Sequence, residues 1–492
     1  MLPIFVIIPL GCAFLIPLTS KVRPSLAKAL AIICGSALLF FSLSSIWWLK
    51  TGVKIYHVGG WRPPFGICMV LDGLTVLMLL VVNIIGFFSL LYSLDYAKRY
   101  TCEYLYYTLF CLLLAGLNGV VISGDLFNLF VFLEITSIAS YALVAFGVEA
   151  EELEASFKYL VLGSVASTLV LLAIGMLLGS VSTLNMADIS RSLNNSTSPN
   201  LILYSVALFI MGFGLKTGLV PFHAWLADAH PSAPAPMSAM LSGVVIKTIG
   251  AYALVRVMFN IIGFSPTISH IFIWLGIISM VIGVLLAIGQ WDFKRLLAYH
   301  SVSQIGYVIF GIGLATPLGI IGGLFHLFNH SLFKSLLFLN AGSVEYATGL
   351  RQLDKLEGLD REMPVTAKTS LVASLSIAGI PPLCGFWSKL IIIIAAFKAH
   401  HFIGAAVCIL VSMVTLASFL KVQKYAFLRR IKDTVSNIKE VPLFMKLSMA
   451  GLALLCIAVG LFFIPVLNHL IKPAAEVLLL GRGYANLILG AP

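Results

Sequence analysis

A hydrophobic stretch of this chain contains a lysine followed by a proline: it reads Gly212-Phe-Gly-Leu-Lys-Thr-Gly-Leu-Val-Pro-Phe-His-Ala-Trp225. The lysine is Lys216 and the proline is Pro221. Because proline lacks a backbone donor and clashes with the preceding turn, we expect a helix to break at this point. Inside a membrane, broken backbone survives only where protein or a water-filled cavity satisfies it. The stretch therefore predicts a polar site within a bundle of membrane helices.

The composition of the whole chain is that of a membrane protein. It has 492 residues, of which 60% are hydrophobic and 10% are charged, whereas about one quarter of a soluble domain is charged. This excludes a soluble enzyme and a disordered protein. The net charge of +11 does not indicate a nucleic-acid binder, because no basic tract or aromatic platform accompanies it. Alternating strands of an outer-membrane barrel are absent as well. We expect an all-α polytopic membrane protein.

About fourteen apolar runs are long enough to cross a bilayer, for which a helix needs ~20 residues. They cover roughly 2–18, 26–49, 70–93, 104–122, 125–147, 157–180, 201–219, 237–258, 268–289, 298–314, 319–342, 368–397, 402–423 and 447–470. The first run lacks a basic n-region, so we expect a retained span rather than a cleaved signal. No linker is long enough to hold a separate soluble domain.

Basic residues in the loops predict the orientation, because positively charged loops stay in the cytoplasm. When the loops are assigned alternately to two sides, one side holds eighteen lysines and arginines, among them Lys294 and Arg351. The other side holds Lys50, Lys54, Arg62, Arg191, Lys398, Lys472 and Arg482. We therefore expect the more basic side in the cytoplasm of a multi-pass cell (inner) membrane protein, with both termini on the outer side.

Further basic residues lie inside the apolar runs: Lys216, Lys247, Arg256, Lys334, Lys389 and Lys421. Arg256 and Lys421 lie near the ends of their runs, so we interpret them as side chains that snorkel to the membrane surface. A lysine in mid-bilayer costs at least ~2.5 kcal/mol, and such residues usually face a bundle interior and mark ion paths. The other four lysines are therefore path candidates. A structural lysine held by backbone carbonyls is the alternative for each, and is less favoured for four together.

One acidic residue, Glu134, lies far from either end of its apolar run. A buried lone carboxylate takes up a proton, whereas beside an ammonium it stays ionised and keeps that ammonium charged. We predict that Glu134 pairs with Lys216. Asp72 and Asp125 lie where apolar runs begin, and since a helix N-terminus favours an anion, we interpret both as structural.

Two histidines and a lysine, His326, His330 and Lys334, follow one another at intervals of four residues. This spacing places three titratable groups along one helix face. A proton relay is one interpretation, because histidine changes charge near neutral pH. A zinc site is a second, since histidines at this spacing can ligate zinc, but no third ligand or general-base Glu lies nearby. A purely structural polar stripe is a third.

The cysteines do not indicate a cofactor. All eight lack the C-x-x-C spacing that an iron–sulfur cluster, zinc or haem attachment needs. We expect no bound cofactor, no metal and no redox centre in this chain.

A second apolar run is broken like the first: Ala378-Gly-Ile-Pro-Pro-Leu-Cys-Gly-Phe-Trp-Ser-Lys389, with Pro381 and Pro382 ahead of Lys389. Paired interruptions in the two halves of a transporter indicate inverted repeats with a binding site at each break. The broken helix is the fourth of five in each of two units, and five is odd, so the second unit enters from the opposite face. The expected parts are three N-terminal spans (1–103), a first repeat (104–258), a second repeat (268–423), and a final span with a tail (424–492).

Several motifs together resemble a known family. They are Gly214-Leu-Lys-Thr-Gly-Leu-Val-Pro-Phe-His-Ala-Trp-Leu-Ala-Asp-Ala-His-Pro-Ser-Ala-Pro-Ala-Pro-Met-Ser-Ala-Met-Leu-Ser-Gly243, Val245-Ile-Lys-Thr-Ile-Gly-Ala-Tyr252, Lys294-Arg-Leu-Leu-Ala-Tyr-His-Ser-Val-Ser-Gln-Ile-Gly-Tyr307, the stripe 326–334 with Asn340-Ala-Gly342, and the second break. The chain resembles, over roughly residues 70–425, the antiporter-like membrane subunits of complex I, of membrane-bound hydrogenases and of Mrp sodium/proton antiporters. The sequences of these motifs are most similar to those of the D-type subunit of Mrp antiporters and of its hydrogenase relatives.

The resemblance implies fourteen transmembrane helices with two inverted five-helix repeats, and it implies roles for the buried charges. Glu134 matches the acid whose ion pair sets the state of Lys216, and Lys247 matches the bridging lysine of the next helix. His326 and His330 match the central polar axis, with Lys334 as part of it. Lys389 matches the terminal group that passes protons outward.

We therefore expect a proton-translocating subunit of a multi-subunit membrane complex, either an Mrp-type Na⁺/H⁺ antiporter or a complex I-related oxidoreductase or hydrogenase. No nucleotide-binding loop or cofactor motif occurs in the chain, so partner subunits or a counter-ion gradient must supply the energy. Two alternatives stay open: a passive membrane scaffold of a redox complex without its own ion path, and a polytopic enzyme that acts on a lipid or quinone. The sequence also leaves open whether Na⁺ moves as well as H⁺.

Overall fold

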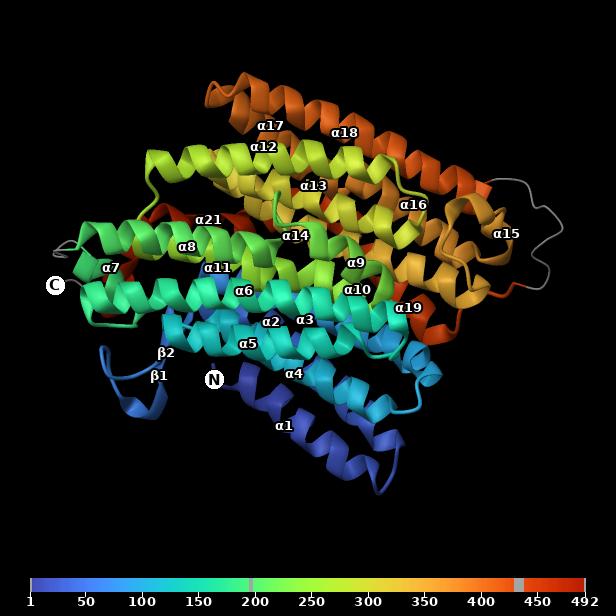
Figure 1. Cartoon of the computed structure of the whole chain (residues 1–492), viewed down its shortest axis with the longest axis horizontal. Coiled ribbons are helices and arrows are strands. Elements are labelled where there is room, and N and C mark those ends of the chain that lie inside the picture. Colours follow the sequence, from blue (N-terminus) through green and yellow to red (C-terminus); the bar gives the residue numbers. More distant parts are fainter. Residues whose placement is uncertain (1, 194–197, 429–437, 491–492) are drawn as a thin grey trace.

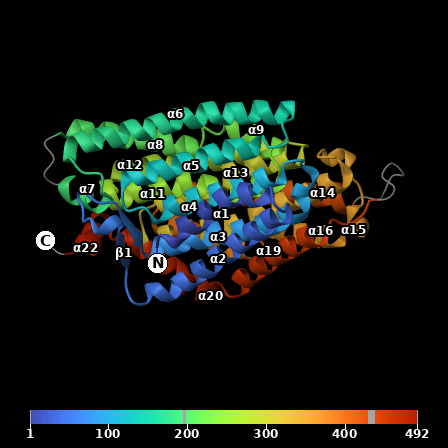
Figure 2. The same cartoon turned by 90° about the horizontal axis from the view of Figure 1, so that it is seen from below.

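Long helices lie side by side along the longest axis of the molecule in the computed structural model (Figures 1 and 2). The structure describes residues 2–193, 198–428 and 438–490. One end of the bundle carries the short strands β1 (Lys54–His57) and β2 (Cys68–Leu71), which pair antiparallel; we call it the hairpin end. The opposite end carries the short helix α15 (Leu359–Glu362), and we call it the α15 end. In both views the marked N- and C-termini lie toward the hairpin end.

Within the described residues, eleven helices are long and apolar enough to cross a membrane. They are α2 (Ser25–Leu49), α3 with its 3₁₀ extension (Gly73–Arg99), α4 (Glu103–Ile122), α5 (Leu126–Val144), α6 (Ala150–Val181), α8 (Pro199–Thr217), the continuous helix α10–η4–α11–η5 (Ala235–Ile262), α12 (Pro266–Ile288), α13 (Phe293–Gly313), α18 with η7 (Phe402–Leu428) and α19 (Leu443–Leu461).

Three of the expected spans fall outside this group for physical reasons. Helix α1 (Ile4–Ser20) has only 17 residues. Helix α14 (Pro317–Thr348) has 32 residues, but polar side chains interrupt its apolar sequence. The run expected at 368–397 is divided at its break into α16 (Pro364–Ala378) and α17 (Cys384–Lys398), each of 15 residues. The number fourteen therefore stays a prediction.

The C-terminal part departs from the expected single span at 447–470. Helix α19 ends at Leu461, and a further apolar segment follows from Phe463 to Leu479. This segment contains α20 (Phe463–Val466), η8 (Leu467–Ile471) and α21 (Lys472–Leu479), and a bend of 99° separates it from Gly481–Leu489, which ends in α22 (Tyr484–Leu489). If that bent pair is one span, the described residues hold up to twelve.

Helix starts follow the capping chemistry of the sequence. The Asp72 carboxylate accepts a 2.8 Å hydrogen bond from the Thr75 backbone at the start of α3. Asp125 does the same for Asn128 at the start of α5, also at 2.8 Å. Each carboxylate satisfies a backbone donor that has no partner inside the helix. The interpretation of both residues as structural N-caps is confirmed.

Both predicted helix breaks are present. Helix α8 ends at Thr217, and after Gly218 and Pro221 the chain resumes as α9 (Ala224–Ser232). Helix α16 ends at Ala378, and α17 resumes after Gly379 and the two prolines. In each break the glycine adopts a left-handed conformation, with φ of 73° at Gly218 and 83° at Gly379. Glycine meets this requirement without steric cost, and so ends the first half of each helix.

Three helices form the centre of the bundle. Almost all residues of α13, of the continuous helix 235–262 and of the middle of α14 are buried. By contrast, α2, α6 and α18 expose many apolar side chains, as expected of helices that face lipid. The central helices carry Lys247, His326, His330 and Lys334, so protein rather than lipid surrounds these polar groups.

Candidate functional site

The predicted pair of Glu134 and Lys216 is present. The Lys216 ammonium lies 3.7 Å from Glu134 Oε1 and donates a 3.0 Å hydrogen bond to Ser137 Oγ. Ser167 on α6 donates a hydrogen bond to the same carboxylate oxygen. The Lys216 side chain is 2% exposed, whereas that of Glu134 is 33% exposed. The carboxylate therefore lies at the perimeter of the helical bundle, and the ammonium lies inside the bundle.

Lys216 occupies the last turn of α8, directly before the first break. Trp225, at the start of α9, donates an indole hydrogen bond of 3.1 Å to the Leu215 carbonyl. Its ring stacks on Tyr159 of α6 with centroids 4.3 Å apart. A small enclosed void beside Lys216 is lined by Tyr159, Trp225 and Ile249, among others. The tryptophan thus joins the two halves of the broken helix through the Leu215 carbonyl, which also accepts a hydrogen bond from the Gly218 backbone.

Lys247 lies on η4 (Leu241–Tyr252), a π-helical segment of the central helix. Its ammonium is fully buried and donates to the carbonyl oxygens of Ser242 and Gly243, at 2.5 and 3.1 Å. Among the described residues, no carboxylate lies within 4.0 Å of it. Ile249, two residues further on, lines the void beside Lys216. The helix that carries Lys247 therefore packs against α8 beside Lys216.

The three polar residues of α14 are completely buried. The His326 and His330 rings have centroids 6.2 Å apart. His326 is hydrogen-bonded through one ring nitrogen to Ser388 at 3.0 Å and through the other to Gln304 at 3.2 Å. Within the described residues, the ring nitrogens of His330 and the Lys334 ammonium have no hydrogen-bond partner. Buried polar groups of this kind need water or a transferred proton to be satisfied.

Lys389 lies in the second turn of α17, just after the second break. Its buried ammonium donates a 2.7 Å hydrogen bond to the Ile377 carbonyl at the end of α16. The ammonium also lies 5.0 Å from the centre of the Tyr307 ring, which is a cation–π distance. Tyr307 in turn lies 5.4 Å from the His326 ring, and the His326 partner Ser388 directly precedes Lys389. Lys389 and the α14 stripe are therefore neighbours.

The zinc interpretation of the stripe gains no further ligand in the structure. Over residues 2–193, 198–428 and 438–490, no group of three or more His, Cys, Asp or Glu side chains is arranged to hold a metal ion. Lys247 and Lys334 lie on two helices that pack against each other, η4 and α14, and their like charges repel. The structure groups the candidate residues at two places, Glu134 with Lys216 at the first break and the α14 stripe with Lys389 at the second, and Lys247 lies on η4, which packs against both α8 and α14.

Arg256 corrects a sequence prediction. We expected it to snorkel to the membrane surface, but its side chain is 2% exposed and its guanidinium lies 2.6 Å from an oxygen of Asp72. It also bonds to Thr75 and Asn260, and the Tyr252 and Tyr484 rings flank it. The partner carboxylate is far away in sequence, so no local pattern could reveal the pair. Lys421, in contrast, lies half-buried and donates to the carbonyls of Ile288 and Gln290 at the end of α12.

Lys294 is a second correction. The sequence assigned it to a surface loop, but Asp292 caps α13 and the helix already begins at Phe293. The Lys294 side chain is 3% exposed and its ammonium lies 2.6 Å from a Glu345 oxygen. It also donates to the carbonyls of Pro231 and Ala233, at 3.4 and 3.1 Å. The acid at its side, Glu345, lies near the end of α14, so it was not recognisable as a partner from spacing.

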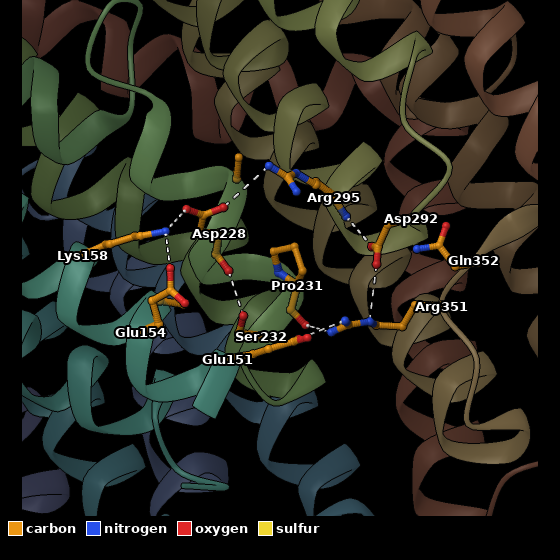
Figure 3. A pocket seen from close by; sticks show the side chains of 12 residues that line it. Glu151, Glu154, Lys158, Asp228, Pro231, Ser232, Asp292, Arg295, Arg351 and Gln352 are labelled. Carbon is orange, nitrogen blue, oxygen red and sulfur yellow. Dashed lines mark hydrogen bonds and ion pairs between the residues drawn. The ribbon is translucent and has the colours of Figure 1, made fainter. Parts of the chain in front are cut away.

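A charged pocket lies beside Lys294, between the starts of α6 and α13 and the end of α9. Figure 3 shows its side chains and their ion pairs. Asp228 lies 3.1 Å from Lys158 and 3.7 Å from Arg295, and Arg351 lies 3.2 Å from Glu151 and 3.4 Å from Asp292. The Pro231 carbonyl accepts a 3.0 Å hydrogen bond from Arg351. The pocket places acids, bases and water-accessible space next to the second half of the first broken helix.

Residues 123–417 match the transmembrane family of NADH:quinone oxidoreductases and Mrp antiporters. The D-type subunit of the Na(+)/H(+) antiporter of Alkalihalophilus pseudofirmus is 34% identical over 452 residues, which cover 91% of this chain and 92% of that protein. The chain belongs to this family. The N-type subunit of the NADH-quinone oxidoreductase of Desulforudis audaxviator is 33% identical over 496 residues, with 96% of this chain and 98% of that protein covered.

The fold agrees with this membership of the NADH:quinone oxidoreductase/Mrp antiporter family. A chain of the Mrp complex from Dietzia sp. DQ12-45-1b superposes with a TM-score of 0.91 at 29% identity, and the superposition covers 99% of both chains. The resemblance that the sequence motifs predicted is therefore confirmed. The chain is a predominantly helical, polytopic membrane protein of that family.

Proposed function

We propose that this chain is a proton-translocating, antiporter-like subunit of a multi-subunit membrane complex. One observation carries the proposal. The ammonium groups of four path candidates, Lys216, Lys247, Lys334 and Lys389, are buried in the helical bundle, and within the described residues Lys216 alone of these four has a carboxylate within 4.0 Å. Such groups are costly in a membrane and usually serve an ion path. The family relationship to the Na(+)/H(+) antiporter and NADH-quinone oxidoreductase subunits described above supports the same function.

The mechanism depends on the neighbours of each lysine. In general, burial disfavours an ammonium, and a nearby carboxylate favours it. While Glu134 stays beside Lys216, it holds the proton there. When the Glu134 carboxylate moves to another partner, Lys216 gives its proton to the next base, Lys247. The proton then passes to Lys334, to the histidines His330 and His326, and to Lys389, with water bridging the gaps.

The exposure of Glu134 supports operation within a complex. One third of this side chain is exposed on α5, and an uncovered carboxylate at membrane depth is costly. A neighbouring membrane subunit that covers this face would offer Glu134 the second partner that the mechanism needs. Each proton moved against 100 mV costs ~2.3 kcal/mol, so partner subunits or a sodium gradient must supply the energy. H⁺ is the ion of the proposed path, with Na⁺ exchange belonging to the antiporter form of the complex.

We further propose that the chain consists of two inverted repeats, 104–258 and 268–423, between three N-terminal spans (1–103) and a C-terminal part (424–492). The similar breaks support this organisation, because each has a left-handed glycine, a proline and a nearby lysine. The α15 end would lie on the cytoplasmic side of the cell membrane, and the hairpin end on its outer side. The C-terminal part includes 429–437, which lie outside the described residues.

Proton translocation by the assembled complex in sealed vesicles tests the proposed function. Lys216→Ala and Glu134→Gln should each abolish translocation while the complex still assembles. Lys398→Ala, which alters an exposed lysine at the end of α17, is the matched control and should translocate at the wild-type rate. Normal translocation by assembled Glu134→Gln and Lys216→Ala complexes would favour the passive scaffold instead. Turnover of a lipid or quinone by the isolated chain would favour an enzyme.

A further inference from the structure

A pocket of about 710 Å³ opens at the hairpin end, between the end of α2 and the C-terminal segments η8, α21 and α22. None of the residues of the proposed proton path lines it. Gly73, at the start of α3, lines the pocket together with Pro473 of α21. A Cβ atom at Gly73 would clash with the Pro473 carbonyl, so α21 packs this closely against α3 because residue 73 is glycine. The pocket therefore lies where the C-terminal segments close against the N-terminal helices.

The lining of the pocket is largely apolar. Its apolar residues are Ile46, Leu49, Val53, Val477, Leu480 and Leu487. Trp47 of α2 lines it as well and is 72% exposed. Phe40 and Leu43, which lie on the same face of α2 as Trp47, are also exposed. An apolar surface thus runs from the pocket along α2, and its length and chemistry suit an acyl chain.

The depth of the pocket in the membrane follows from the end of α2. This helix ends at Leu49, and two tryptophans, Trp47 and Trp48, occupy its last turn. Indole rings prefer the level of the lipid headgroups. Lys50 follows directly, and a lysine at a helix end reaches the polar side of that boundary. The pocket is therefore at headgroup level, and the exposed face of α2 continues from it into the hydrocarbon.

Two opposite charges line the pocket without pairing. Lys50 and Glu476 are both exposed, and neither has an ion-pair partner within 4.0 Å among the described residues. The Lys50 ammonium instead lies 4.7 Å from the centre of the Trp47 ring. His469 of η8 lines the same pocket and supplies an imidazole N–H donor. A ligand that carries both an anion and a cation would complement these groups.

We propose that this pocket binds a zwitterionic phospholipid with a primary ammonium, that is, a lipid of the phosphatidylethanolamine type. Its phosphate is held by the Lys50 ammonium and the His469 imidazole, and its ammonium donates to the Glu476 carboxylate. One acyl chain follows the exposed face of α2 past Leu43 and Phe40. The bound lipid links α2 to η8 and α21. This site is independent of the proposed proton path.

Binding of three lipids to the purified, assembled complex tests the headgroup assignment. Native mass spectrometry should show that phosphatidylethanolamine binds more tightly than phosphatidylcholine, whose quaternary ammonium cannot donate a hydrogen bond, and than phosphatidylglycerol, which has no cation. Lys50→Gln should weaken phosphatidylethanolamine binding by about fivefold, as expected for one basic side chain at a lipid headgroup. Glu476→Gln should abolish the preference over phosphatidylglycerol. Equal affinity of the wild-type complex for the three lipids would overturn the proposal.

The control variant for these measurements is Lys398→Gln. Lys398 is an exposed lysine at the end of α17, beside the exposed ring of Phe397, and it does not line the pocket. Its substitution should leave the affinities for all three lipids unchanged. A loss in Lys398→Gln as large as that in Lys50→Gln would show that general surface charge attracts the lipid, and would overturn the site.

Photo-cross-linking distinguishes a lipid from a neighbouring subunit as the occupant. Leu480 lines the pocket and is 47% exposed, so a benzophenone side chain introduced at this position reaches the bound molecule. Irradiation of the complex in its membrane should attach phosphatidylethanolamine above its share of that membrane, and Lys50→Gln should remove the enrichment. Attachment to another subunit, or lipid products that follow the membrane composition, would overturn the proposal.

Discussion

The Lys389 ammonium donates a 2.7 Å hydrogen bond to the Ile377 carbonyl, so one side chain joins the two halves of the second broken helix. The carbonyl is one of those at the end of α16 that have no partner inside the helix. Carbonyls at a helix C-terminus carry partial negative charge and stabilise a cation. Lys216 has a carboxylate at its break, whereas Lys389 has a backbone carbonyl and the Tyr307 ring. The two breaks therefore hold their lysines by different means.

The first prediction concerns this backbone-held lysine. Lys389→Met should abolish proton translocation, because methionine fills the same space but cannot carry a proton. The complex should still assemble, since no buried carboxylate is left without a partner. Translocation by assembled complexes in sealed vesicles is the measurement, and Lys398→Met on the same helix is the control. A normal rate in Lys389→Met would remove Lys389 from the path.

A second prediction concerns Ser167, which donates a hydrogen bond to the Glu134 carboxylate. Ser167→Ala should slow translocation by up to about tenfold, because a hydrogen bond to a charged group contributes ~1.5 kcal/mol. The matched control is Thr168→Ala, which removes an exposed hydroxyl that bonds only to its own helix. Rates of the two variants are compared at equal amounts of assembled complex. Identical rates would mean that Ser167 does not hold Glu134 in place.

A third prediction separates structure from transport at the pair of Asp72 and Arg256. Asp72→Asn leaves the guanidinium buried without its partner, which should destabilise the protein by ~3–5 kcal/mol. Thermal unfolding of the purified complex measures this, and Asp360→Asn, at an exposed position on α15, is the control. The double variant Asp72→Asn/Arg256→Gln should recover part of the loss, because it removes the unpaired charge. A Tm equal to the wild type in Asp72→Asn would contradict this account.

A fourth prediction concerns the exposed ion pairs of the pocket in Figure 3. Lys158 lies 2.8 Å from Glu154 and 3.1 Å from Asp228, but its side chain is 46% exposed. Exposed pairs contribute little to stability, because solvent screens them. Lys158→Ala should therefore leave the Tm of the complex unchanged within experimental error. A clear fall in Tm would mean that this network holds α6 against α9.

Local sequence patterns predicted those parts of the site that depend on residues close together in the sequence. Prolines inside apolar runs predicted each helix break, and the lone mid-span carboxylate of Glu134 predicted its ion pair with Lys216. Spacing predicted that His326, His330 and Lys334 share a helix face. Acid residues at the starts of apolar runs predicted the caps formed by Asp72 and Asp125.

Partnerships between distant segments could not be predicted in this way. The Asp72 carboxylate meets Arg256 only because α3 packs against the helix 235–262, and Glu345 meets Lys294 only at the α15 end.

The burial of α14 and of the helix 235–262 has a consequence for how the chain responds to its bilayer. Since neighbouring helices enclose nearly every group of the proposed path, changes in acyl-chain length or headgroup type reach those groups only indirectly. Glu134 is different, because a third of its side chain lies at the perimeter. Sensitivity to whatever lies against the chain, a neighbouring subunit or lipid, is thereby concentrated in a single carboxylate.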